Sequence, residues 1–158
     1  MLYETGWDVL AFDEEEVDDP PDVPFTEIVN GHENRFLDAH MIMGYSQGGG
    51  AVHDLIERLY DEEDILTRMG VYIDAVDHDG AFPENDWPDV TYYLLNFYQE
   101  YEGFRGGPID TNEPLPGTFM DQINVTDTLP TIGHTEIDQL QGIFDIIVDQ
   151  LDFYVVFR

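Results

Sequence analysis

The feature that most restricts the fold of this chain is a glycine-rich junction at residues 44–50, Gly-Tyr-Ser-Gln-Gly-Gly-Gly. The residues before it, 38–43, form an apolar run of strand length. After it we expect an amphipathic helix, whose apolar face is Val52, Leu55, Ile56 and Leu59. A strand that turns directly into a helix is typical of parallel sheets, because their strands are joined by helical crossovers.

The same alternation continues along the chain. Predicted strands lie at residues 6–12, 38–43, 71–76 and about 118–125. Besides the helix after the junction, we expect a helix from Pro24 to Phe36. We expect another that is opened by Pro88, with the apolar residues Val90, Leu94, Phe97, Tyr98 and Tyr101. Thr135 is expected to cap a long final helix, whose apolar residues are Ile137, Leu140, Phe144, Ile147, Val148 and Leu151. Residues 14–21 are expected to be a solvated loop, and residues 153–157 a short strand or a docked tail. This order predicts a single α/β domain over residues 1–158, with a mostly parallel sheet flanked by helices.

The composition restricts the partners of this domain. The chain has 35 acidic residues, 5 Arg and no Lys, for a formal net charge of −30, so it would repel nucleic acid and anionic membranes. It has no Cys, which excludes thiol catalysis, and no apolar run reaches the roughly 20 residues of a membrane span. Asp in excess over Glu, without Lys, resembles the surfaces of proteins from salt-accumulating halophiles, where salt screens self-repulsion. We therefore expect a cytoplasmic protein of a high-salt organism, with secretion left open if the N-terminus is truncated.

The pattern Gly44-x-Ser46-x-Gly48 lies at the strand-to-helix junction, which is the context of a nucleophile elbow. A sharp turn there forces the serine into strained backbone angles, and glycines on either side remove Cβ atoms that would clash. The hydroxyl is then presented at the start of a helix, whose dipole favours developing negative charge. The alternative is a glycine-rich turn with an idle serine.

A serine nucleophile needs a histidine base that is oriented by a carboxylate. His134, in the turn before the final helix, is the best candidate base, and Asp74, at the end of the third predicted strand, is the best candidate acid. Asp77 and then Asp79 are the alternatives to Asp74. His53 and Glu57, four residues apart, could be metal ligands, but no third ligand accompanies them, so we predict neither a metal nor a cofactor.

These residues resemble the α/β-hydrolase superfamily, and specifically its esterase- and lipase-like serine hydrolases. The elbow at residues 44–49, Asp74 within residues 71–76 and the late Gly133-His134 carry the resemblance, which spans roughly residues 6–150. It implies a three-layer sandwich in which Ser46 attacks an acyl carbonyl, His134 relays the proton, Asp74 orients His134 and the backbone N–H of Gln47 is one oxyanion donor. The implied substrate is a neutral carboxylic ester or lipid, since an anionic one would be repelled.

The chain also departs from this family. Members normally carry further strands before the segment that residues 6–13 resemble, and one of those strands leads to the second oxyanion donor. We therefore expect a short or N-terminally truncated member. Its alternative role is that of an inactive or partial domain that binds or assembles, for example as a dimer, through an exposed sheet edge. Acyl chain length, the distinction from thioesterases and peptidases, and the oligomeric state stay open.

Overall fold

The computed structural model describes residues 9–13, 22–35, 37, 39–77, 83–88, 90–101, 103–109 and 117–156, without the side chain of Val156. Within these residues, four strands form one sheet in the order β1-β2-β3-β4, and every neighbouring pair is parallel. The strands are β1 (Met41–Tyr45), β2 (Thr67–Ile73), β3 (Thr91–Tyr98) and β4 (Phe119–Asn124). The prediction of an α/β domain with a parallel sheet flanked by helices is therefore confirmed.

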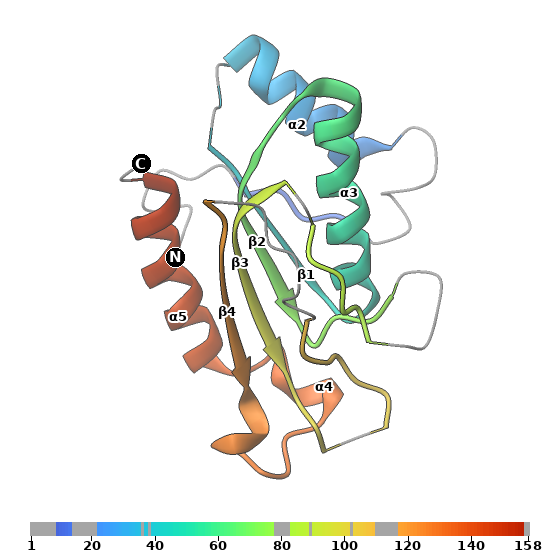
Figure 1. The fold of residues 1–158 in the computed structure, drawn as a ribbon, viewed down its shortest axis with the longest axis vertical. Helices are drawn as coiled ribbons and strands as arrows, with labels where there is room; N and C mark the ends of the chain where they lie inside the picture. Colours follow the sequence, from blue (N-terminus) through green and yellow to red (C-terminus); the bar gives the residue numbers. More distant parts are fainter. Residues whose placement is uncertain are drawn as a thin grey trace.

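Helices cover both faces of this sheet (Figure 1). The helices α2 (Val23–Arg35) and α3 (Gln47–Glu63) lie on one side, and α5 (Gln141–Leu151) lies on the other. The short helix α4 (His134–Ile137) lies at the end of the sheet toward which the strand arrows point. The remaining elements are a 3₁₀ turn, η2 (Val125–Asp127), and a π-helical turn, η3 (Asp152–Val156).

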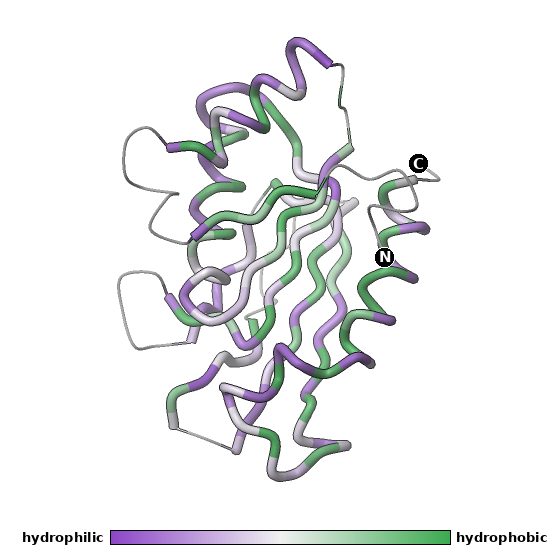
Figure 2. Tube along the Cα trace, turned by 180° about the vertical axis from the view of Figure 1, so that it is seen from behind, coloured by the Kyte–Doolittle hydropathy of each residue, from purple (hydrophilic) through white to green (hydrophobic). Residues whose placement is uncertain are grey.

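Each face of the sheet has its own apolar core. On the α5 side, buried residues of β2 and β3 pack against Ile143, Ile147 and Leu151. On the α3 side, Val52 and Ile56 pack against Tyr72 and Leu94. Figure 2 shows hydrophobic and hydrophilic residues alternating along α5, as expected for a helix with one buried face. The two cores hold the strands rigidly and therefore fix the positions of the residues that follow them.

The helix predicted after Pro88 is wrong, because residues 91–98 form the strand β3. This strand is central in the sheet and contributes to the apolar cores on both sides of it, so both of its faces are buried and carry apolar residues. The spacing of Val90, Leu94 and Phe97 then imitates a helical face by coincidence. The sequence Thr-Tyr-Tyr-Leu-Leu-Asn-Phe-Tyr is rich in the aromatic residues that strands favour. Tyr101, which we expected to be on the same apolar face, is 56% exposed.

The long final helix is also wrong in one respect, because it is divided into α4 and α5. Leu140 is the extended residue before α5, and Thr135 lies inside α4, whose N-cap is Gly133 instead. The break lets α4 follow the edge of the sheet while α5 packs along its face. Val148, expected on the apolar face, is 41% exposed. Residues 152–156 continue α5 as the turn η3, so the alternative of a further strand there is wrong.

The other predicted elements differ mainly in their bounds. The strand predicted at 38–43 is β1 at 41–45, the strand predicted at 71–76 is β2 at 67–73, and the strand predicted at about 118–125 is β4 at 119–124. The helix after the junction is α3, and the helix from Pro24 is α2, with Phe36 outside the described residues. Residues 9–12 of the predicted first strand have no regular secondary structure and are exposed. The loop at 14–21 lies outside the described residues.

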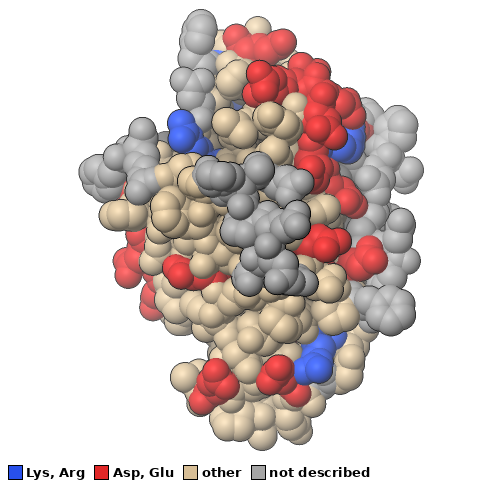
Figure 3. Space-filling view, in the orientation of Figure 1, with Lys and Arg blue, Asp and Glu red and all other residues tan. Residues whose placement is uncertain are grey.

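Acidic side chains dominate the charged surface in Figure 3, with a run of them on the side where α3 lies. The cation on that helix, Arg58, pairs with Asp22 at 2.6 Å and with Glu62 at 3.2 Å. The first pair connects α3 to the residue before α2, and the second joins two residues of α3. None of the helices in the described part of the chain combines the length and apolar character that a bilayer crossing would need.

Candidate active site

Ser46 lies between β1 and α3 in a backbone conformation that residues other than glycine rarely adopt, with φ 57° and ψ −129°. Its amide donates to the carbonyl of Ile73 at 3.1 Å, and its carbonyl accepts from the amide of Val76 at 2.9 Å. The elbow is therefore fixed to the end of β2. Because the surrounding structure holds Ser46 in this strained conformation, the turn has the features predicted for it from the sequence.

The glycines around the elbow have different roles. A Cβ on Gly44 would lie 1.9 Å from the carbonyl oxygen of Gly48, so this position requires glycine. A Cβ on Gly49 would lie 2.3 Å from the Cβ of Ala75, so the absence of a side chain at Gly49 allows α3 to approach the end of β2. At Gly48 a Cβ would meet nothing within 4 Å. The prediction that glycines on both sides of the serine prevent a clash is thus right for Gly44 and wrong for Gly48.

Asp74 follows β2 directly and is completely buried, with a positive φ of 48°. Its position relative to Ser46 follows from the sheet register, because Tyr45 and Ile73 are paired residues of neighbouring strands. One carboxylate oxygen, Oδ1, accepts the amides of Gly106 at 2.7 Å and Gln99 at 3.2 Å. The other, Oδ2, accepts from the side chain of Gln99 at 3.1 Å. These N–H donors compensate for the burial of a negative charge.

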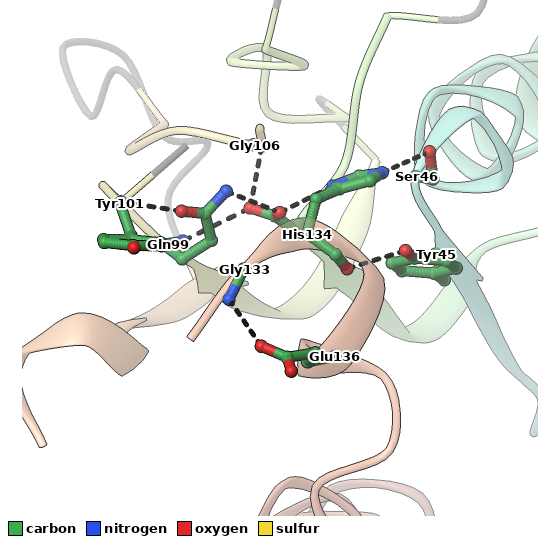
Figure 4. Close-up of polar contacts among 9 residues, drawn as sticks. Tyr45, Ser46, Gln99, Tyr101, Gly106, Gly133, His134 and Glu136 are labelled. Atoms are coloured by element: carbon green, nitrogen blue, oxygen red, sulfur yellow. Dashed lines mark hydrogen bonds and ion pairs between the residues drawn. The ribbon is translucent and has the colours of Figure 1, made fainter. Parts of the chain in front are cut away.

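His134, the first residue of α4, connects this carboxylate to the serine (Figure 4). Its Nδ1 lies 2.7 Å from Oδ2 of Asp74, and its Nε2 lies 2.7 Å from Oγ of Ser46. A carboxylate can only accept, so we assign the proton of the neutral imidazole to Nδ1. Nε2 then carries the lone pair that accepts from the serine hydroxyl. The arrangement can therefore remove a proton from Ser46 while Asp74 stabilises the resulting imidazolium.

Two aromatic residues and one backbone contact hold His134 in place. Tyr45 stacks on the imidazole with ring centroids 5.0 Å apart, and its hydroxyl donates to the His134 carbonyl at 2.7 Å. Phe104 packs edge-on against the imidazole at 4.8 Å and is 43% exposed. At the start of α4, the carboxylate of Glu136 accepts the amide of Gly133 at 3.3 Å (Figure 4). His134 is only 6% exposed, so its rotation is restricted on several sides.

The predicted oxyanion donor, Gln47, is the first residue of the 17-residue helix α3. The N–H of a first helical residue has no partner inside its helix, and it lies at the positive end of the helix dipole. Gln47 directly follows Ser46 in the chain. This geometry is compatible with the predicted role, which stays a prediction.

The alternatives raised from the sequence lie elsewhere. Asp74 occupies the position beside Nδ1 of His134 for which Asp77 was the alternative, and Asp79 lies outside the described residues. His53 contacts Asp54, the next residue in the chain, at 3.3 Å. In the part of the chain that the structure describes, no group of three His, Cys, Asp or Glu side chains is arranged to hold a metal ion.

A shallow depression of about 450 Å³ lies beside α4. Its lining includes Leu129, Pro130, Ile132, Glu136 and Leu140. None of Ser46, Asp74 and His134 lines it. The Ser46 hydroxyl therefore lies outside this depression.

Four residues of this site are absent from the predicted set of Ser46, His134, Asp74 and Gln47, namely Tyr45, Gln99, Phe104 and Gly106. Gln99 and Gly106 reach Asp74 from 25 and 32 residues further along the chain. Only the position of Gln99, directly after β3, could have indicated it, because parallel strands end at one edge of a sheet.

No protein-family model matches this chain, and neither the curated proteins nor the solved structures contain a match.

Proposed function

We propose that this protein is a serine hydrolase, which cleaves a neutral carboxylic ester or lipid through an acyl-enzyme. The observation that supports this most directly is the chain of two 2.7 Å contacts from Ser46 through His134 to Asp74. A positioned base, its orienting carboxylate and a hydroxyl at a helix N-terminus are the parts that acyl transfer needs. We also propose that the protein belongs with the α/β-hydrolases of the esterase and lipase type, which its sequence resembles.

In the proposed reaction, Nε2 of His134 takes the Ser46 proton as Oγ forms a bond to the acyl carbon. The carbonyl π electrons move to its oxygen, and the Gln47 N–H stabilises that negative charge. The tetrahedral intermediate collapses, the bond to the alkoxy oxygen breaks, and the imidazolium gives its proton to the leaving alcohol. A water molecule, activated by His134 in the same way, then releases the acid and restores Ser46.

Two observations support a neutral and partly apolar substrate. The net charge of −30 repels anionic substrates, and Figure 3 shows few cationic groups on the visible face. Phe104 contacts the imidazole edge-on and is 43% exposed, so part of its ring is available to an acyl or alcohol group. Apolar contact beside the base suits an ester better than a charged substrate.

The test is covalent labelling with a fluorophosphonate probe at molar salt. Ser46 is the only serine in the chain, so a peptide map assigns the label without ambiguity. We expect labelling of the wild type, none in Ser46→Ala, and strongly slowed labelling in His134→Ala. His53→Ala is the matched control, since His53 contacts Asp54 rather than Ser46. If folded wild-type protein is not labelled, the hydrolase proposal is wrong, and a binding or assembly role takes its place.

A further inference from the structure

We propose that Gln99 is a positioning residue, which holds the Asp74 carboxylate in the orientation that His134 needs; this inference rests on the proposed function. Gln99 is completely buried and follows β3 directly, as Asp74 follows β2. The amide of Asp74 donates to the carbonyl of Phe97 on β3 at 2.7 Å, so the two strand ends are joined. Gln99 therefore meets Asp74 from a rigid element.

The contacts of Gln99 fix the carboxylate on both of its oxygens. Its backbone amide donates to Oδ1 at 3.2 Å and its side-chain Nε2 donates to Oδ2 at 3.1 Å. Oδ2 is the same oxygen that receives Nδ1–H of His134. Rotation of the carboxylate about its Cβ–Cγ bond would break both contacts with Gln99, so the oxygen facing His134 is held where it is.

The direction of the Gln99 amide is itself determined. Its Oε1 accepts the backbone amide of Tyr101 at 2.7 Å, as Figure 4 shows. A flip of the amide would place Nε2 against the Tyr101 N–H and Oε1 against the Asp74 carboxylate, which would lose two hydrogen bonds and create two repulsive contacts. Nε2 must therefore face Asp74. A main-chain N–H, two residues along the chain, thus determines which atom the glutamine offers to the acid.

This position needs glutamine rather than glutamate. A carboxylate at residue 99 would have no hydrogen to offer to Oδ2 of Asp74 and would add a second negative charge beside it, unless one of the two took up a proton. Protonation of that pair would weaken the acceptor for Nδ1–H of His134. The chain has 14 Glu and 21 Asp, yet it has an uncharged amide at this contact.

The experiment compares Gln99→Met and Gln99→Glu with the same substitutions at Gln122. Gln122 is a matched control, because its side chain also connects a strand to a loop, accepting from the Ile109 amide at 2.7 Å and donating to the Ile109 carbonyl at 3.1 Å. Two quantities are measured on full-length protein: the rate of fluorophosphonate labelling of Ser46, and the proton resonance of Nδ1–H of His134. The resonance reports the contact with Asp74 and does not require catalysis.

Loss of one hydrogen bond to a charged acceptor predicts labelling about 10- to 100-fold slower in Gln99→Met, and slower still in Gln99→Glu. The Nδ1–H resonance should move upfield or broaden in both, and stay unchanged in the Gln122 variants, with melting temperatures checked for all four. Gln99→Met that keeps the wild-type rate and resonance overturns the positioning role. A wild type that shows the resonance but no labelling overturns the proposed function alone. If Gln99→Glu fails to fold, Gln99→Met still decides the question.

Discussion

Replacement of Asp74 by asparagine is the sharpest test of the site, because its outcome follows from the directions of four hydrogen bonds. Oδ1 accepts the backbone amides of Gln99 and Gly106, which cannot turn away. Oδ2 accepts Nε2 of Gln99 and Nδ1 of His134. In Asp74→Asn, a side-chain NH₂ in place of Oδ1 would leave two buried backbone donors without an acceptor, at about 1–3 kcal/mol each. In place of Oδ2 it leaves one buried donor, Nε2 of Gln99, without an acceptor, and it faces the imidazole, which can change tautomer and accept from it.

The second orientation is therefore favoured, and it moves the imidazole proton from Nδ1 to Nε2. An Nε2–H faces Oγ of Ser46 as a donor and cannot remove the serine proton. In Ser-His-Asp sites, loss of the correct tautomer lowers kcat by about 10⁴-fold. At 1.36 kcal/mol for each factor of ten, this is about 5 kcal/mol of transition-state stabilisation. We expect this loss with little change in KM, since Asp74 is completely buried and does not reach the substrate.

The assay is hydrolysis of a neutral p-nitrophenyl ester at molar salt, together with the rate of fluorophosphonate labelling. Asp121→Asn is the control, because Asp121 accepts from the Tyr93 hydroxyl at 2.8 Å, and neither residue contacts Ser46 or His134. It should keep a near wild-type rate. If Asp74→Asn folds normally and stays within tenfold of the wild-type rate, then Asp74 does not set the tautomer of His134, and the tautomer argument is wrong.

Three further predictions concern stability. A Cβ at Gly44 would lie 1.9 Å from the Gly48 carbonyl oxygen, so Gly44→Ala should lower the free energy of unfolding by about 3 kcal/mol. Gly48→Ala, in the first turn of α3, should instead raise it by up to about 1 kcal/mol, because a Cβ there meets nothing within 4 Å. Urea titrations measure both values, and equal effects of the two substitutions would contradict this prediction. Burial, with smaller effects of His32 and Arg68, lowers the pKa of His40 from 6.5 to about 4. Above pH 6.5 this imidazole is neutral whether the chain is folded or unfolded, and between pH 6.5 and about 4 only the unfolded chain binds the proton. Up to about 3 kcal/mol of the free energy of unfolding is therefore lost as the pH falls through this range. The pH dependence of the melting temperature should be shallower in His40→Gln than in the wild type, and identical slopes would refute the assignment. Finally, the melting temperature should rise between about 0.1 and 1 M KCl, as the Debye length falls from about 10 to about 3 Å around a chain of net charge −30, and a melting temperature independent of KCl would count against self-repulsion.

The strand-to-helix junction could be predicted because its causes are local. Gly44 and Ser46 are close in the chain, and the change from a strand-length apolar run to helical spacing is visible in a short window. The chain order of Ser46, Asp74 and His134 was sufficient to place them at one edge of a parallel sheet, where they do lie within hydrogen-bond distance. The choice of Asp74 over Asp77 had only a weak basis in the sequence, since both follow the same strand.

Tertiary structure alone decided the nature of residues 91–98 and the surroundings of Asp74. Hydrophobic periodicity indicates which face of an element is buried, and it carries no information about β3, a central strand buried on both faces. The contacts of Gln99 and Gly106 with Asp74 join segments 25 and 32 residues apart, through backbone N–H groups that every residue except proline has and that no sequence pattern distinguishes. The sequence thus determined which groups could react, and the packing of β2 against β3 determined which groups hold the acid in place.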